Sequence, residues 1–493
     1  MRTPSARDLR AHAVLTFAHA LVIGALNRRM HDRDSRHVHD ALADLVTALR
    51  RAATLGVDMP LQLQCADDRI CHDGESLDGP SLQARSLLRD LRQRGIAMLS
   101  FGPRLDVEEA NRLYDLLLLD DNVAAFARST RDAALAAFGV RNVRVSLRAA
   151  ADPSDRRCGV DGTDRALHQY QDLADCLQQT HARALRDQEL AVHAAANVVE
   201  RAVTGMDEPS LLLSLAAQDD VDRFTVGHSV RVALLALQVA RAVGATREQS
   251  VQVGSAALLH DIGKSKVPQE VLFKQGRLTA DEWHWMQQHP RLGAQILLEQ
   301  HEHVAAGTIC AAFCHHMRPD GKGYPESLVS VAPGGTSRLV RVCDVFEALT
   351  SIRPYKRALT PIEAYAVMFR NERDFDVQWL RVFARTIGLF PNGTRVRLRS
   401  GAAAVVREQT GCPEKPIVQL LTGPDDSALP PGQPDRFRIG DLCEGKPMAI
   451  HAVDTHDRCI TVPDFDPKDL ALPTHACLSP ALVHDLTATP AKG

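Results

Sequence analysis

Seven histidines and aspartates in the middle of the chain have side chains of the kind that bind divalent metals. They are His228, His260, Asp261, His289, His315, His316 and Asp344. Neutral imidazoles and carboxylates are ligands of borderline metals such as iron, manganese and zinc. Seven ligands are too many for one closed tetrahedral site, but they suit two metals that share a carboxylate. Because two-metal centres typically hydrolyse phosphate esters or amides, the pattern predicts a metal-dependent hydrolase.

Two short motifs accompany these ligands. His260 and Asp261 lie in the segment AALLHDIGK, and Gly323, Tyr324 and Pro325 lie in the segment DGKGYPESL. With the other ligands in order around them, residues 215 to 390 resemble the HD-GYP family, a branch of the HD phosphohydrolases. The resemblance implies a helical domain that hydrolyses cyclic di-GMP to pGpG, and further to GMP in some members. Only the resemblance suggests this substrate, whereas the ligand set by itself predicts a two-metal phosphohydrolase.

The resemblance also implies how the ligands are shared between two metals, most naturally iron or manganese. The first metal would be held by four residues, His228, His260, Asp261 and Asp344. Asp261 would bridge to the second metal, whose other ligands would be His289, His315 and His316. Adjacent helical residues point about 100° apart, which would let His260 bind one metal while Asp261 reaches both. Asp261 and Lys264 are the predicted catalytic residues.

Basic residues near the ligands could bind the substrate phosphates. Lys264 follows His260 by four residues, which would place both on one helix face. Arg353 and Lys356, in SIRPYK, match phosphate-contacting positions of the family, and a guanidinium fork beside an ammonium group suits a phosphate clamp. The alternative is ordinary surface ion pairing. The glycine-rich loop that ends in Gly323, Tyr324 and Pro325 would line the substrate pocket, where Tyr324 could stack on a nucleotide.

The chain departs from the family pattern after the paired histidines and before the first one. Met317 stands where the family usually has Glu, which would remove an outer-shell partner and reduce activity without loss of the metals. Members with a third metal use a Glu four residues before the first histidine, and this chain has Phe224 there. Asp222, six residues before His228, would point away from the ligands. The sequence therefore predicts two metals and not three.

Length and composition predict a mainly α, multi-domain protein. The chain has 493 residues, 45% of them hydrophobic, and a formal net charge of −3, which gives no general attraction for nucleic acid. Alternating patterns and helical periodicity predict an N-terminal α+β region and, after Pro391, a small β-barrel-like extension. The predicted parts are an N-terminal domain (8–150), a linker with connecting helices (151–205), the helical phosphohydrolase domain (206–390), the β extension (391–462) and a loosely ordered tail (463–493).

Two segments bear on partners and location. Residues 163–205 are rich in helix formers, so they form either a signalling or homodimer helix or a hairpin packed on the next domain. The apolar run of residues 13–26 is shorter than the roughly 20 residues of a membrane span. A secretory signal is an alternative, but apolar positions continue at helical spacing to Leu49, which favours an amphipathic helix without a membrane span. Eleven cysteines without a CxxC pair are typical of a reduced compartment, so we expect a cytoplasmic protein.

Two other classes of function stay open. One is an HD-type phosphohydrolase for another cyclic dinucleotide or nucleotide. The other is a non-enzymatic sensor that binds cyclic di-GMP and signals through the N-terminal region. The complete ligand set favours an enzyme, while Met317 favours a sensor.

Overall fold

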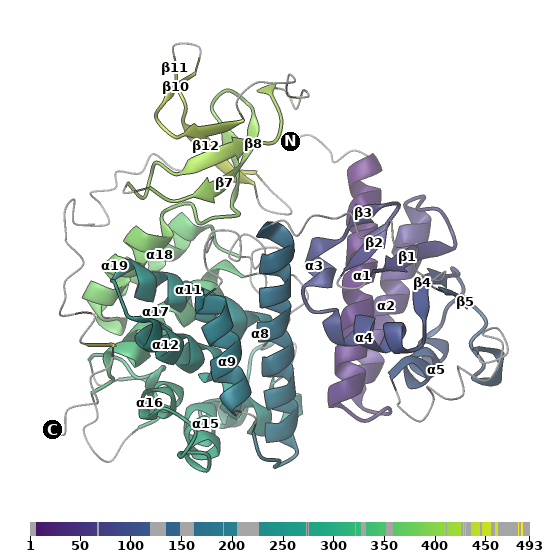
Figure 1. The fold of residues 1–493 in the computed structure, drawn as a ribbon, viewed down its shortest axis with the longest axis horizontal. Helices are drawn as coiled ribbons and strands as arrows, with labels where there is room; N and C mark the ends of the chain where they lie inside the picture. The colour runs from purple at the N-terminus through teal and green to yellow at the C-terminus, as the bar shows by residue number, and fades with distance from the viewer. Residues whose placement is uncertain are drawn as a thin grey trace. The chain divides into compact units, whose positions relative to one another are not determined.

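The computed structural model (Figure 1) describes most of the chain, which divides into two compact units with the main sequence boundary after Asp175. The described residues are 6–66, 69–118, 135–147, 162–190, 192–204, 226–272, 274, 276–320, 322–326, 332–351, 358–410, 412–424, 427, 429, 435–443, 446–454, 459–461, 482 and 485–486. Four residues considered above lie outside them, namely Asp222, Phe224, Arg353 and Lys356.

The first unit contains an antiparallel sheet with the strand order β3-β2-β1-β4-β5. Its strands are β1 (Leu61–Cys65), β2 (Ile70–His72), β3 (Glu75–Ser76), β4 (Ile96–Phe101) and β5 (Val143–Leu147). Buried and exposed residues alternate along β1, as expected for a sheet with one face against a core. These strands account for the β part of the predicted N-terminal α+β region.

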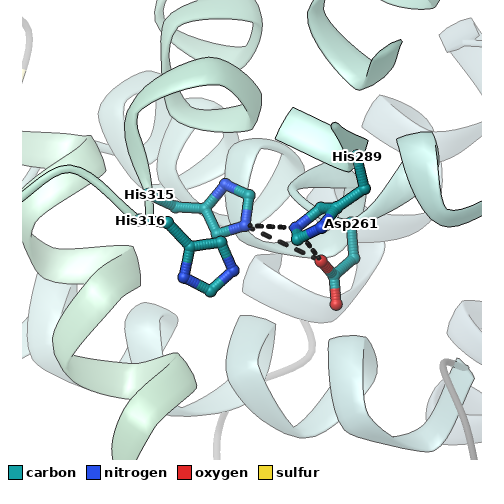
Figure 2. Close-up of side chains that lie close together, drawn as sticks. All are labelled: Asp261, His289, His315 and His316. Carbon is teal, nitrogen blue, oxygen red and sulfur yellow. Dashed lines mark hydrogen bonds and ion pairs between the residues drawn. The ribbon is translucent and has the colours of Figure 1, made fainter. Parts of the chain in front are cut away.

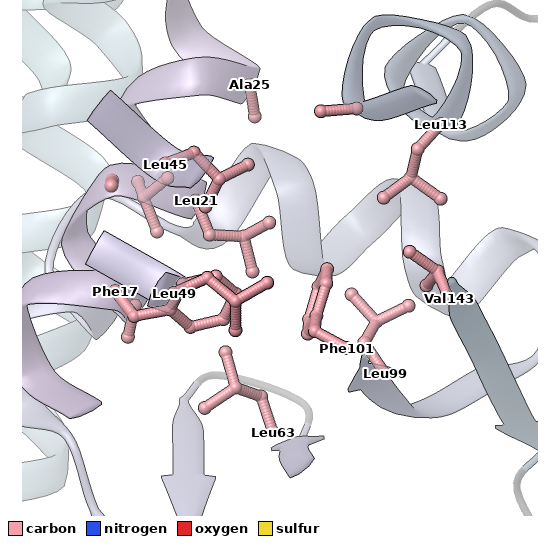
Figure 3. Packing of buried hydrophobic residues seen from close by; sticks show 14 of the residues in the cluster. Phe17, Leu21, Ala25, Leu45, Leu49, Leu63, Leu99, Phe101, Leu113 and Val143 are labelled. Atoms are coloured by element: carbon pink, nitrogen blue, oxygen red, sulfur yellow. The ribbon is translucent and has the colours of Figure 1, made fainter. Parts of the chain in front are cut away.

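Helices supply the other side of this core. They are α1 (Ala6–Met30), α2 (Arg36–Thr54), α3 (Asp78–Ser81), α4 (Arg85–Gln93) and α5 (Val107–Leu118). Figure 3 shows Phe17 and Leu21 of α1 and Leu49 of α2 facing Leu63 and Phe101 of the sheet. The predicted α+β character of the N-terminal region is therefore confirmed.

The first helix, α1, is longer than the apolar run suggests. Its segment Leu9–Met30 is long and apolar enough to cross a membrane by length and composition. However, 56% of that window is buried within the protein, and its apolar side chains belong to the core of the first unit. An amphipathic helix buries its apolar face against a core, so the burial of α1 agrees with the predicted amphipathic helix.

The predicted helices in residues 163–205 are α8 (Gly162–Leu185) and α9 (Val192–Thr204). Buried residues recur along α9 at helical spacing, and α9 packs against α12 (Arg247–Leu259). This packing agrees with the alternative in which the helix covers the next domain.

The second unit is built mainly from helices. They are α11 (Val226–Ala242), α12, the 3₁₀ helix η3 (Ile262–Lys266), α13 (Gln269–Leu272), α14 (Ala280–Met286), α15 (His289–Leu298), α16 (Ala306–Cys314), α17 (Gly335–Thr350), α18 (Pro361–Arg370), η4 (Glu372–Asp374) and α19 (Val377–Ile387). α11 packs against α12 and α17, and α16 packs against α12 and α15. The predicted helical domain is confirmed over its described residues.

A β sheet follows the helices, as the period-two pattern after Pro391 predicts. Its antiparallel order is β13-β12-β6-β7-β8-β9, with a separate β10-β11 pair. The strands are β6 (Arg395–Leu398), β7 (Ala403–Glu408), β8 (Ile417–Leu420), β9 (Arg436–Arg438), β10 (Leu442–Cys443), β11 (Lys446–Pro447), β12 (Ile450–Asp454) and β13 (Cys459–Thr461). The described part of the chain is thus mainly helical, with three antiparallel sheets of five, two and six strands.

Candidate metal centre

The seven predicted ligands come from five parts of the helical domain, and all except Asp344 lie at or near helix ends. His228 is in the first turn of α11, and Asp344 is in α17. Histidines also lie at the first residue of α15 and directly after α16. His260 is the residue after α12, and Asp261 directly precedes η3. Since α11, α12, α16 and α17 pack against one another, residues more than 100 positions apart come together.

One group of ligand atoms contains His228, His260 and Asp344, all within 4.8 Å of one another. The Nε2 atom of His228 lies 3.2 Å from Oδ1 of Asp344 and 3.6 Å from Oδ2 of Asp261. His260 Nε2 lies 3.4 Å from the same Asp261 oxygen. Asp261 Oδ2 therefore faces this group.

The second group contains Asp261, His289, His315 and His316, again with their ligand atoms within 4.8 Å of one another. Figure 2 shows these four side chains pointing toward one another. Asp261 Oδ1 lies 3.2 Å from His289 Nε2 and 3.7 Å from His315 Nε2. The two oxygens of Asp261 thus face different groups, which is the arrangement of a bridging carboxylate.

Backbone contacts orient three of the imidazoles. The Nδ1 atoms of His260 and His289 lie 2.7 Å from the carbonyl oxygens of Ala257 and Met286, respectively. His315 Nδ1 lies 2.9 Å from the Ala312 carbonyl. A carbonyl only accepts hydrogen bonds, so each Nδ1 carries the proton and each Nε2 presents a lone pair to the centre. Such fixed tautomers are typical of metal-binding histidines.

Two buried polar atoms indicate that a metal fits here. His260 Nε2 and Asp261 Oδ1 are buried and have no hydrogen-bond partner among the described residues. Leaving a buried polar group unpaired costs about 1–3 kcal/mol, and coordination would satisfy both atoms. Burial also lowers the pKa of His315, to about 4, and keeps the pKa of His316 well below its usual value. Both imidazoles are therefore neutral near pH 7, as ligands must be.

Lys264 lies beside the predicted metal ligands, but its helical geometry differs from the one that the sequence predicted. The prediction placed it on one α-helix face with His260, and this is wrong because α12 ends at Leu259 and η3 follows. In a 3₁₀ helix, residues three apart are eclipsed. Lys264 accordingly pairs with Asp261, its neighbour at i−3. Burial opposes ionisation of Asp261, but the Lys264 charge together with the contacts to His260 and His289 outweighs it, so the pKa of Asp261 stays well below its usual range.

Glu347 is a residue of the centre that the sequence reasoning missed. It lies three residues after Asp344 on α17, is 3% exposed, and forms an ion pair with Nδ1 of His228. Arg231 holds the other oxygen of Glu347 at 2.6 Å. Burial alone would lower the pKa of His228, but the Glu347 and Asp344 carboxylates raise it to about 9, so a metal that binds Nε2 would have to displace a proton from this imidazole. The sequence could have indicated Glu347, because a carboxylate one helical turn after a ligand lies on the same face of the helix.

Two glycines that were also missed bring the ligand elements together. A Cβ atom on Gly263 would lie 1.9 Å from the carbonyl oxygen of His289 and 2.4 Å from the nitrogen of Gly293. No side chain fits at that distance, so η3 can approach α15 only with glycine at position 263. This approach sets Asp261 beside His289.

The predicted substrate loop closes back on the paired histidines. Tyr324 stacks on His316 with ring centroids 4.5 Å apart and an interplanar angle of 26°. Gly323 has φ +95, a left-handed conformation, and a Cβ there would lie 2.3 Å from the His316 carbonyl oxygen. Met317 is 9% exposed and forms an isolated β-bridge with Gly323. The residue that replaces the usual Glu therefore packs against this loop.

Comparisons with known proteins agree with this site. An HD domain family model matches residues 212–378. A cyclic di-GMP phosphodiesterase of Pseudomonas aeruginosa is 39% identical over 44% of this chain and 53% of its own length. A cyclic di-GMP phosphodiesterase response regulator of Xanthomonas campestris is 42% identical over 30% of this chain and 39% of its own length. A 3'3'-cGAMP-specific phosphodiesterase of Vibrio cholerae is 32% identical over 34% of this chain and 36% of its own length.

The chain spans about half the length of the first of these relatives and less of the others. The matched part coincides with the helices that bring the ligands together. Residues 212–378 thus match an HD domain, and in ligand order and in the HD and GYP motifs this part of the chain is similar to the HD-GYP branch of that family.

Proposed function

We propose that this protein is a metal-dependent phosphodiesterase that hydrolyses cyclic di-GMP to pGpG and ends or tunes second-messenger signalling. The main observation is that Asp261 faces both ligand groups with different oxygens. The named activities of the relatives support the substrate class, since two of those described above act on cyclic di-GMP. GMP is a further possible product.

The proposed roles of the ligands follow from the two groups in which their ligand atoms lie. His228, His260 and Asp344 would hold the first metal and His289, His315 and His316 the second, and Asp261 would be shared, which the grouping of these ligand atoms supports. Iron or manganese suits this mixed imidazole and carboxylate set. A bound metal pair supplies Lewis acidity to the phosphate and lowers the pKa of the attacking water.

The chain's own side chains position the substrate. Lys264 is held at Asp261, with part of its side chain exposed, so that its ammonium can bind a phosphate oxygen beside the metals. Arg353 and Lys356 provide a phosphate clamp by the family resemblance, and they lie outside the described residues. Gly323, Tyr324 and Pro325 are the proposed lining of the substrate pocket, and the stacking of Tyr324 on His316 supports this role.

The remaining parts of the chain fit a signalling enzyme. The proposed division is an N-terminal input domain (8–150), connecting helices (151–205), the phosphohydrolase domain (206–390), the β extension (391–462) and a tail (463–493). The N-terminal domain and the connecting helices are the proposed sites for a homodimer contact or a signalling partner. We place the protein in the cytoplasm, because its eleven cysteines without a CxxC pair are typical of a reduced compartment.

Turnover of a panel of cyclic dinucleotides by the full chain tests the proposal. The protein is purified without oxygen, supplied with iron or manganese, and incubated with cyclic di-GMP, 3'3'-cGAMP and cyclic di-AMP. Chromatography should show pGpG from cyclic di-GMP, and the Asp261→Ala variant should show none. Binding without turnover would favour the sensor alternative and contradict the enzyme.

A second candidate substrate is 3'3'-cGAMP, because one relative is named as specific for it. The same panel distinguishes the two, since a higher kcat/KM for 3'3'-cGAMP would reassign the substrate while the reaction type stays the same.

A further inference from the structure

Two exposed tryptophans lie on the short helix that leads to a metal ligand. Trp283 and Trp285 of α14 are 46% and 50% exposed, and α14 ends three residues before His289. The helix is held firmly at its start, because Thr279 and Glu282 form a capping box and Lys274 pairs with Glu282 at 2.5 Å. The tryptophans are therefore presented to solvent by an ordered element.

Only Trp283 adjoins the metal centre through aromatic contacts. Its ring lies edge-on to Tyr324 with centroids 5.9 Å apart and an interplanar angle of 79°. Tyr324 in turn stacks on His316. A series of rings thus leads from the second ligand group to an exposed indole. Trp285 is two residues further along the helix, about 200° around its axis, and has no ring contact among the described residues.

The substrate chemistry matches this placement. A cyclic dinucleotide whose phosphate lies at the metals must extend its sugars and purine bases outward from them. A purine has an apolar, polarisable face that stacks on aromatic side chains. Trp283 lies beside the loop that borders the metal centre, and nearly half of its surface is open to receive a base.

We propose that Trp283 is a stacking platform for a guanine base of cyclic di-GMP, and this inference rests on the proposed function. Trp283 acts on substrate binding rather than on the chemical step, since its ring contact among the described residues is with Tyr324 and not with a predicted metal ligand. The tryptophan thereby selects for a nucleotide over a simple phosphodiester.

Steady-state kinetics of three variants in the metal-loaded full chain test the proposal. Trp283→Leu removes the ring but keeps an apolar side chain, Trp283→Phe keeps a ring, and Trp285→Leu is the matched control on the same helix. Trp283→Leu should raise KM for cyclic di-GMP on the order of ten- to hundredfold with little change in kcat. Trp283→Phe should recover most of the loss, and Trp285→Leu should match the wild type.

Tryptophan fluorescence gives a readout that does not depend on turnover. In a Trp285→Phe background, a slowly hydrolysed phosphorothioate analogue of cyclic di-GMP should quench the exposed indole of Trp283. A wild-type KM in Trp283→Leu, or no quenching on saturation, overturns the stacking role alone. If the wild type neither binds nor hydrolyses any cyclic dinucleotide, the proposed function fails together with this inference.

Discussion

Leu49 in the first unit and His315 in the metal centre are both 0% exposed, yet their surroundings differ in kind. Leu49 lies among apolar side chains from two helices and a sheet, where burial itself is favourable. His315 lies among three other imidazoles and a carboxylate, where burial is unfavourable unless each polar atom has a partner. The first interior stabilises the fold, whereas the second requires a bound ion to satisfy its polar atoms.

The largest expected effect is loss of metal. Its extent should differ between the shared carboxylate, Asp261, and a ligand of one metal, His289. Asp261→Ala should lose metal from both groups, because its two oxygens face different groups. His289→Ala should lose metal from the second group and keep about one ion per chain. Both should reduce turnover by more than the roughly 10–100-fold that loss of an outer-shell partner produces. Elemental analysis checks this, and equal metal losses in the two variants would contradict the bridging role.

A smaller effect is expected for the carboxylate behind His228. Glu347→Gln keeps the shape but removes the charge that holds His228 Nδ1 and Arg231. Metal affinity of the first group should fall by roughly 10–100-fold, with the second group unchanged. Metal titration of the variant measures this, with the exposed Glu248→Gln as control. An unchanged affinity would mean that Glu347 only packs against α11.

In the apolar interior of the first unit, by contrast, a substitution should lower stability and leave the metal content unchanged. Leu49→Ala should lower the free energy of unfolding of the first unit by about 2–5 kcal/mol, through lost burial and a cavity. The metal content should not change, because Leu49 belongs to a core without predicted ligands. Denaturant unfolding and elemental analysis check both statements, and Arg50→Ala, on an exposed position of α2, is the control. Loss of metal in Leu49→Ala would show that the two interiors are coupled.

These differences explain how much of each interior could be predicted from the sequence. Alternation and helical spacing predicted that the N-terminal region combines strands and helices, because burial of one face determines such patterns. The ligand set was predicted because metal ligands are few in type and ordered along the chain. Lys264, Gly263 and Glu347 were misplaced or missed, since their roles depend on where α12 ends and how closely η3 approaches α15.

The smallest expected effect concerns a histidine of the first unit. Burial lowers the pKa of His31 to about 4, the neighbouring His37 lowers it further, and Asp32 opposes the shift. The unfolded chain therefore binds this proton first as the pH falls, so the first unit should lose stability between about pH 6.5 and pH 4. Denaturant unfolding at pH 7 and pH 5 should show a larger loss in the wild type than in His31→Phe. Equal losses would contradict the role of His31.

The number of metal ions per chain, measured together with turnover of cyclic di-GMP, tests the account most directly. Protein purified without oxygen and reconstituted with iron or manganese should hold two ions per chain, because the ligands form two groups that share Asp261. A chelator should remove the ions and the turnover together, and the metal should restore both. Full turnover with one ion per chain, or turnover that survives removal of all metal, would contradict the two-metal centre.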